Sequence, residues 1–327
     1  LTCLGNMASD HGDLCEKIRN TGVISPAIQH LSSNDEAVVE AASFVLCSLI
    51  RSPQPRVGEL IDKGIIEPLI GALSRSGNEE TIVELMWLLS YILAAGKKFG
   101  VLFLQAPYPL IELLVNHLSN AIKSNFIPSL MPLIRVLSNI VCVMSGPDDQ
   151  TTKLVAFPVF LPCVLQCLRD CDNRAVKKES AWLVSNIAAS EPSNVVKLIE
   201  GNFVPTLVDL LRNYGFDIRK EAAFSLMNIA ANCQAIELVV SAGALPSFLS
   251  LLSCHDREVV SLSLSFVALV LRSHPNGPKI VEESDGISAL ESVNMELLPE
   301  EYDYANSLVD EFYGLEEEEG EGDRWGG

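Results

Sequence analysis

The chain has 327 residues, of which 48% are apolar and only 6% aromatic, and its net charge is −19. A chain of this length needs two domains or a stacked array, and the aliphatic, aromatic-poor balance favours helices packed on helices over a β-sandwich. The acidic surface would repel a phosphate backbone and attract basic partners, which argues against nucleic-acid binding.

The first ten residues, from Leu1 onward, resemble the end of a repeat unit, so we expect the sequence to be a fragment with a truncated first repeat. A proline then marks the start of each unit, at Pro26, Pro68, Pro109, Pro162, Pro205 and Pro246, with intervals of 42, 41, 53, 43 and 41 residues. Proline suits the first turn of a helix, where no N–H is needed. Four of these prolines follow a residue that can adopt a left-handed conformation and end the preceding helix, namely Gly22, Gly64, Asn202 or Gly243.

Each proline-led segment is followed by a longer helical segment with an aromatic residue or Arg at a fixed place. These residues are Phe44, Trp87, Arg135, Trp182 and Phe224, and they lie 18, 19, 26, 20 and 19 residues after their prolines. The longest spacing, from Pro109 to Arg135, predicts an insertion at residues 123–129, which we expect to be a polar loop between two helices. Short polar turns, such as residues 32–35 and 170–173, separate the helices of other units.

A period of about 42 residues with two main helices per unit is typical of armadillo and HEAT repeats. One unit cannot bury its apolar face alone, so the units must stack around a continuous inner groove that is lined by the last helix of each. We predict an all-α protein, a right-handed superhelix (α-solenoid) of armadillo repeats. Residues 1–10 would end a truncated repeat, residues 11–313 would form about six further repeats, the last a degenerate cap, and residues 314–327 an acidic disordered tail.

Other sequence features argue against membrane insertion, metal binding and catalysis. The longest apolar run, residues 259–271, is too short to cross a bilayer and predicts a buried helix. The nine cysteines are consistent with reduced thiols in a cytosolic or nuclear protein. Cys163, Cys167 and Cys171 share a helix face without a matching histidine, so we interpret them as packing residues rather than zinc ligands. No catalytic or cofactor motif is present, and we predict that the protein is not an enzyme.

One helix face combines a carboxylate, an aromatic ring and an amide. Glu179, Trp182 and Asn186 have i, i+3 and i+7 spacing, and Glu221, Phe224 and Asn228 repeat the pattern 42 residues later. An Asn offers a donor and an acceptor to an extended backbone, and a cation over an indole gains about 0.5–2 kcal/mol. Such a face could hold a basic peptide. The aromatic residues could instead be core residues, and the amides could cap or bridge helices within the stack.

The helices at residues 177–189 and 219–231 resemble the K-E-A-x-W-x-x-x-N helices of the importin α (karyopherin α) armadillo family. Residues 137–141 with 146–151 resemble its G-N-I-V-T-G-x-D-x-Q-T repeat, and residues 283–319 its last repeat and acidic end. Transmembrane and coiled-coil domain-containing proteins, which are importin-α-like relatives, share this degenerate pattern.

This resemblance implies a groove that receives the basic, extended segment of a nuclear localisation signal. The implied peptide-binding residues are Arg135, Asn139, Glu179, Trp182, Asn186, Glu221, Phe224 and Asn228, with Glu179 and Glu221 adding charge attraction. The earlier repeats match less well, because Thr2 stands in the Trp place and Ser48 follows Phe44; Tyr91 follows Trp87, as in one repeat of the family. The weaker candidates there are Asn6, Phe44 and Trp87. We favour a structural role for Ser48 and Tyr91.

The resemblance also implies partners and a location. Basic peptide segments of cargo proteins would bind the groove, an import carrier (importin β) would bind through a missing N-terminal segment, and an export receptor would bind at the C-terminal repeat. The protein would then occupy both cytoplasm and nucleus, without a cofactor. The alternative is an armadillo scaffold that has lost signal binding and joins two folded proteins.

Overall fold

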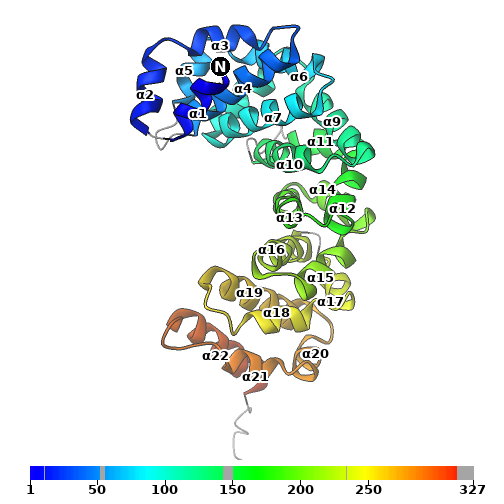
Figure 1. Cartoon of the computed structure of the whole chain (residues 1–327). Helices are drawn as coiled ribbons and strands as arrows, with labels where there is room; N and C mark the ends of the chain where they lie inside the picture. The colour runs from blue at the N-terminus through cyan, green and yellow to red at the C-terminus, as the bar shows by residue number, and fades with distance from the viewer. Residues whose placement is uncertain (11, 52–55, 143–149, 233, 315–327) are drawn as a thin grey trace, which may run out of the picture. The chain divides into compact units, whose positions relative to one another are not determined.

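The computed structural model describes residues 1–10, 12–51, 56–142, 150–232 and 234–314, and these residues form α-helices and connecting turns without a β-strand (Figure 1). The prediction of an all-α fold is therefore confirmed. The acidic tail from residue 315 onward and much of the segment resembling the G-x-D-x-Q-T motif lie outside the described residues.

The helices follow one another with short connections. In chain order they are α1 (Thr2–Asp10), α2 (Gly12–Asn20), α3 (Ile24–His30), α4 (Glu36–Ile50), α5 (Val57–Asp62), α6 (Ile66–Arg75), α7 (Glu79–Ala94), α8 (Lys97–Gln105), α9 (Leu110–Ser124), α10 (Ile127–Val141), α11 (Gln150–Val155), α12 (Phe160–Arg169), α13 (Arg174–Ala188), α14 (Pro192–Glu200), α15 (Phe203–Asn213), α16 (Phe216–Asn232), α17 (Ile236–Ser241), α18 (Leu245–Leu251), α19 (Arg257–Ser273), α20 (Gly277–Glu283), α21 (Gly286–Glu291) and α22 (Pro299–Tyr313).

The chain divides into two compact units, which we call unit 1 (Leu1–Thr206) and unit 2 (from Leu207 onward). In unit 1 the helices α1, α4, α7, α10 and α13 pack side by side in one layer, and α3, α6, α9 and α12 form a second layer against it (Figure 1). In unit 2, α16, α19 and α22 pack in the same succession. Each unit is thus a stack of helical repeats.

The predicted breaks between repeats are confirmed by the backbone. Gly22, Gly64, Asn202 and Gly243 have φ angles of 79°, 77°, 60° and 89°, in the left-handed region that stops a helix. In the degenerate last repeat the left-handed residue is Asp285, at φ 59°, one position before Gly286. A Cβ on Gly286 would lie 2.5 Å from the backbone oxygen of Val281, so close packing requires glycine there.

The polar turns end where an Asn or Asp caps the next long helix. Asn78 Oδ1 accepts hydrogen bonds from the backbone N–H groups of the first turn of α7. Asn173 does the same for α13, Asp35 for α4 and Asp256 for α19. These caps satisfy amides that have no partner within the helix and typically contribute about 1 kcal/mol each. They fix the starting point of the helices that carry the candidate site.

The prediction of a polar loop at residues 123–129 is wrong. The extra residues lengthen α9, which spans Leu110–Ser124, whereas the corresponding helices α6 and α12 are each 10 residues long. The extension stays helical because apolar Leu118 and Ala121 continue the buried face of α9. Asn125 then ends the helix with a φ of 55°, and α10 begins at Ile127.

The apolar run at residues 259–271 lies within α19 and is largely buried, as predicted. In the described part of the chain no single helix is long and apolar enough to cross a membrane. The bent pair α8 and α9, with 97° between the two helices, meets the length and composition criteria only when both are taken together.

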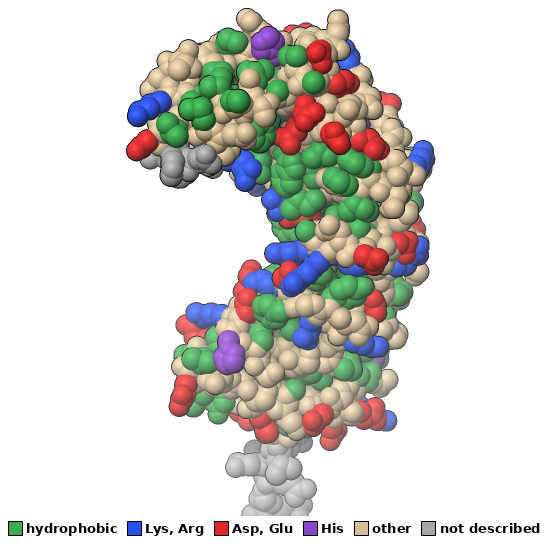
Figure 2. All heavy atoms as spheres, viewed as in Figure 1, with side chains coloured by type: hydrophobic (Ala, Val, Ile, Leu, Met, Phe, Trp, Pro, Cys, Tyr) green, Lys and Arg blue, Asp and Glu red, His purple; other side chains and the backbone are tan. Residues whose placement is uncertain are grey.

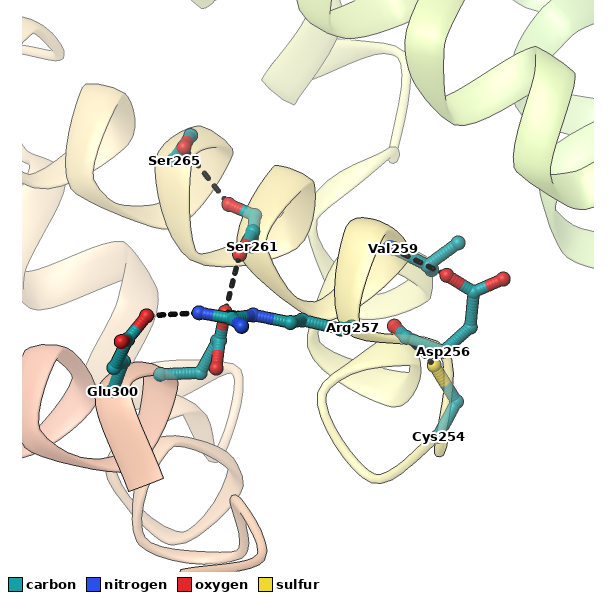
Figure 3. A network of polar contacts seen from close by, with 8 residues as sticks. Cys254, Asp256, Arg257, Val259, Ser261, Ser265 and Glu300 are labelled. Carbon is teal, nitrogen blue, oxygen red and sulfur yellow. Dashed lines mark hydrogen bonds and ion pairs between the residues drawn. The ribbon is translucent and has the colours of Figure 1, made fainter. Parts of the chain in front are cut away.

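A network of hydrogen bonds and ion pairs joins α22 to α19 (Figure 3). Arg257 Nε donates to Glu301 Oε1 at 2.7 Å, Ser261 Oγ donates to the same oxygen at 2.9 Å, and Arg257 also pairs with Glu300. Arg272 pairs with Glu311 at 2.7 Å. Figure 2 shows acidic and basic side chains interspersed over the surface of unit 2, in keeping with these pairs. The polar network and the buried Leu308 join α22 to the rest of unit 2, and the role of this repeat as a cap stays a prediction.

Candidate peptide-binding surface

After its first two residues, α13 of unit 1 is exposed to solvent along a single narrow stripe. Between Val176 and Ala188 every residue is buried except Lys178, Trp182 and Asn186, which lie four residues apart. Such spacing places three side chains in a row along one face of the helix. Trp182 and Asn186 are therefore at the surface and are not core residues, as the peptide-binding hypothesis requires.

On α16 of unit 2 the same positions are partly exposed. Phe224 and Asn228 share this face with Glu221, while Ala222, Ala223, Ser225 and Leu226 between them are buried. The sequence repeat of 42 residues thus gives the two helices matching surfaces. Glu221 and Asn228 both take part in interactions within the protein.

The neighbouring helix α10 carries Arg135 and Asn139 on its own exposed stripe, and Arg135 reaches across to α13. Its Nε donates to Glu179 Oε2 at 3.2 Å, and a second guanidinium nitrogen pairs with the other carboxylate oxygen. The Arg135 side chain is 35% exposed but that of Glu179 only 10%. The hydrogen bond that Arg135 donates to Glu179 raises the pKa of Arg135 above its usual value.

This ion pair corrects the role given to Glu179 by the sequence. The carboxylate is buried and its charge is compensated by Arg135, so it does not add a free negative charge for a peptide. Only the spacing along one helix was visible in the sequence; the partner lies on a different repeat, 44 residues away.

The amide of Asn186 has unused hydrogen-bonding capacity. Its Nδ2 is buried and has no hydrogen-bond partner among the described residues. Buried polar groups in folded proteins almost always have partners, and this Nδ2 could donate to a ligand only after the partly exposed side chain rotates it outward. Asn139 Nδ2 makes only a long contact of 3.4 Å to the backbone oxygen of Ser90.

Two cations next to the predicted stripe have structural roles that the sequence did not reveal. Lys177 is buried, and its Nζ donates to the backbone oxygens of Leu168 at 2.6 Å and Arg169 at 3.0 Å, at the end of α12. In unit 2, Arg219 Nε donates to the backbone oxygen of Leu211 at 3.0 Å. A positive charge at a helix C-terminus is favourable. A sequence pattern could have revealed these roles: Lys177 and Arg219 lie 42 residues apart, and each directly precedes a Lys-Glu pair.

The weaker candidates Asn6 and Phe44 lie together at the N-terminal end of unit 1. They line a pocket of ≈ 360 Å³ with Glu40 and Glu84. The Phe44 ring packs on Gly5 of α1, where a Cβ would lie 2.5 Å from ring carbon Cδ1. Ser48 is buried, as its expected structural role requires.

Trp87, the third weaker candidate, stacks on Tyr91, with ring centroids 5.6 Å apart. Both rings are partly exposed on α7. The sequence favoured a purely structural role for Tyr91, but its ring is also part of the partly exposed face of α7.

Cys163 and Cys167 lie on α12, but Cys171 lies in the turn after it, so the prediction that all three share a helix face is wrong; the helix ends at Arg169. Cys163, Cys167 and Cys171 are buried free thiols, and burial raises the pKa of Cys167 to about 12. Among the residues that the structure describes, no three His, Cys, Asp or Glu side chains gather so that they could hold a metal ion.

Sequence comparisons show that the chain is similar to importin α subunits. The chain is 31% identical over 310 residues to importin subunit alpha-2 of Oryza sativa subsp. japonica, covering 90% of this chain and 57% of the relative. It is 30% identical over 330 residues to importin subunit alpha-9 of Arabidopsis thaliana, covering 95% and 62%. The chain thus spans about six tenths of the length of these relatives. No protein-family model matches it.

Solved structures show the armadillo-repeat fold. A designed armadillo-repeat protein is similar with a TM-score of 0.65 and 26% identity, covering 74% of this chain and 98% of the design. Computationally designed armadillo-repeat proteins for modular peptide recognition are similar with a TM-score of 0.64 and 25% identity, covering 75% and 98%. An engineered protein has a TM-score of 0.79 at 24% identity over 94% of this chain and 72% of its own length.

Proposed function

We propose that the chain, which has the armadillo-repeat fold and is similar in sequence to importin α subunits, binds basic, extended peptide segments such as nuclear localisation signals. The observation that carries the proposal is the stripe on α13, where Trp182 and Asn186 are partly exposed between buried neighbours. The matching face of α16 in unit 2, with Phe224 and Asn228, supports it independently.

Each residue type has a definite task in this proposal. In unit 1 the amides of Asn139 and Asn186, and in unit 2 that of Asn228, hydrogen-bond N–H and C=O groups of an extended peptide backbone, which have no internal partners. The faces of Trp182 and Phe224 hold Lys or Arg side chains, and Phe is the weaker of the two partners for a cation. Glu221 adds charge attraction, whereas Arg135 and Glu179 hold α10 and α13 in register.

The biological setting is part of the same proposal. The relatives are named as importin α subunits, which favours a role as an adaptor in nuclear protein import, in the cytoplasm and nucleus. An import carrier and an export receptor would be the partners of such an adaptor. A scaffold that joins two folded proteins would use the same fold without a preference for basic peptides.

A peptide titration tests the proposal. A fluorescently labelled Lys/Arg-rich peptide should bind the full chain with saturable anisotropy, and its affinity should fall with rising salt because charge attraction is screened. A matched peptide with Gln at every Lys and Arg position should bind at least ~10-fold more weakly. Equal affinity for both peptides, or binding of neither, would reject the proposed function and leave the scaffold.

A further inference from the structure

Unit 1 carries an aromatic surface on α7 that is distinct from the stripe of α13. The rings of Trp87 and Tyr91 are nearly parallel, with an interplanar angle of 20°, and their centroids are 5.6 Å apart. Both are partly exposed, and the three residues between them are buried. An exposed face of this kind is suited to a Lys or Arg side chain.

A cation of the chain itself already occupies this surface. Arg51, the residue that follows the last turn of α4, places its guanidinium carbon 5.6 Å from the centroid of the Tyr91 ring. This distance lies within the range of a cation–π contact. The α4 and α7 helices pack directly against each other, so the contact bridges two successive repeats.

A second arginine approaches Tyr91 from the opposite neighbour of α7. Arg135 on α10 interacts electrostatically with Tyr91, and its guanidinium is held by Glu179. Burial raises the pKa of the Tyr91 hydroxyl, and both Arg51 and Arg135 act against that rise. Tyr91 therefore lies near the Arg51 guanidinium, near Arg135, whose charge is paired with Glu179, and near the carboxylate of Glu84.

We infer that Arg51 is an internal occupant of the Trp87–Tyr91 surface and excludes the Lys and Arg side chains of a peptide from it. A peptide cation would have to displace the Arg51 guanidinium from the Tyr91 ring, and like charges at short range repel each other. Arg51 is exposed, so its contact with Tyr91 can be exchanged without unfolding the repeat. The part of this inference that concerns peptides rests on the proposed function. In that function, Arg51 would be a residue that determines peptide specificity.

Cationic quenching of Trp87 fluorescence tests the occupancy without any peptide. In a chain with Trp182→Phe and Trp325→Phe, the remaining indole is Trp87. Adding Arg51→Gln should raise quenching by Cs⁺ about two- to five-fold, and quenching by neutral acrylamide less, because a positive charge that repels Cs⁺ is removed from the ring on which Trp87 stacks. Arg169→Gln removes an arginine with an exposed side chain elsewhere in unit 1 and should change neither. Equal Cs⁺ quenching in the Arg51→Gln and Arg169→Gln chains would overturn the inference.

A binding measurement tests its consequence for specificity. With Asn186→Ala and Asn228→Ala in place, adding Arg51→Gln should increase affinity for the Lys/Arg-rich peptide about two- to five-fold, since the aromatic pair becomes available. No increase, or the same increase with Arg169→Gln, would contradict it. If the wild-type chain binds no basic peptide, the proposed function fails, and the caesium measurement still decides the role of Arg51.

Discussion

Replacing Asn186 and Asn228 together by alanine should lower the affinity for a Lys/Arg-rich peptide by at least ~30-fold. Each amide is proposed to make two hydrogen bonds to the peptide backbone, and each such bond contributes about 0.5–1.5 kcal/mol. Their sum is therefore about 2 kcal/mol or more. Titration of the labelled peptide into the purified chain measures the loss directly.

The stability of the single Asn186→Ala variant separates a ligand role from a structural one. Asn186 Nδ2 has no hydrogen-bond partner among the described residues, so its removal breaks no bond between them. The unfolding free energy should stay within about 0.5 kcal/mol of wild type or rise, because an unsatisfied buried donor is lost. A large drop in stability, with peptide affinity unchanged in the double variant, would assign Asn186 to the helix stack.

The matched control for this experiment is Asn120→Ala. Asn120 is an exposed amide on α9, in the second layer of unit 1. Its removal should change neither peptide affinity nor stability beyond about 0.5 kcal/mol. If Asn120→Ala weakens binding as much as the Asn186 and Asn228 changes, the effect does not come from the proposed stripe.

Arg135→Ala should destabilise unit 1 by about 2–3 kcal/mol, the largest effect on stability that we expect from a single polar substitution. The change leaves the buried carboxylate of Glu179 without its counter-charge, and breaking a buried ion pair from one side costs about 3–5 kcal/mol. We expect a loss below this range because the Arg135 side chain is 35% exposed and solvent screens part of the interaction. Chemical denaturation of wild type and variant measures the difference.

Two further variants serve as controls for the Arg135→Ala prediction. Arg169→Ala removes an arginine whose pair with Asp170 is exposed, and it should cost less than about 0.5 kcal/mol. Changing Arg135 and Glu179 together to Leu should recover most of the loss, since no unpaired charge is then buried. The account of this pair is wrong if Arg135→Ala is as mild as Arg169→Ala, or if the double change is no better than the single one.

Local features of the fold were predictable because they depend on a few consecutive residues. Glycine and asparagine at Gly22, Gly64, Asn202 and Gly243 favour a positive φ through their small or polar side chains, and all four adopt it. The buried and exposed positions of α13 follow from its helical period, which is fixed by the chain itself.

Features that depend on packing between repeats were not predictable in the same way. Whether Arg135 faces solvent or meets Glu179 depends on the offset between α10 and α13, which side chains far apart in sequence determine together. The same holds for Arg51 and Tyr91. The spacing between Pro109 and Arg135 revealed an insertion, but a longer helix and a longer loop give the same count of residues.

Emission of Trp182 during a peptide titration tests the central claim most directly. In a chain with Trp87→Phe and Trp325→Phe, only Trp182 reports, and its indole lies on the stripe proposed to hold a cationic side chain. We predict a saturable change in emission with the Lys/Arg-rich peptide, at the same midpoint that the anisotropy of the label gives. Binding that leaves the emission of Trp182 unchanged would contradict the account.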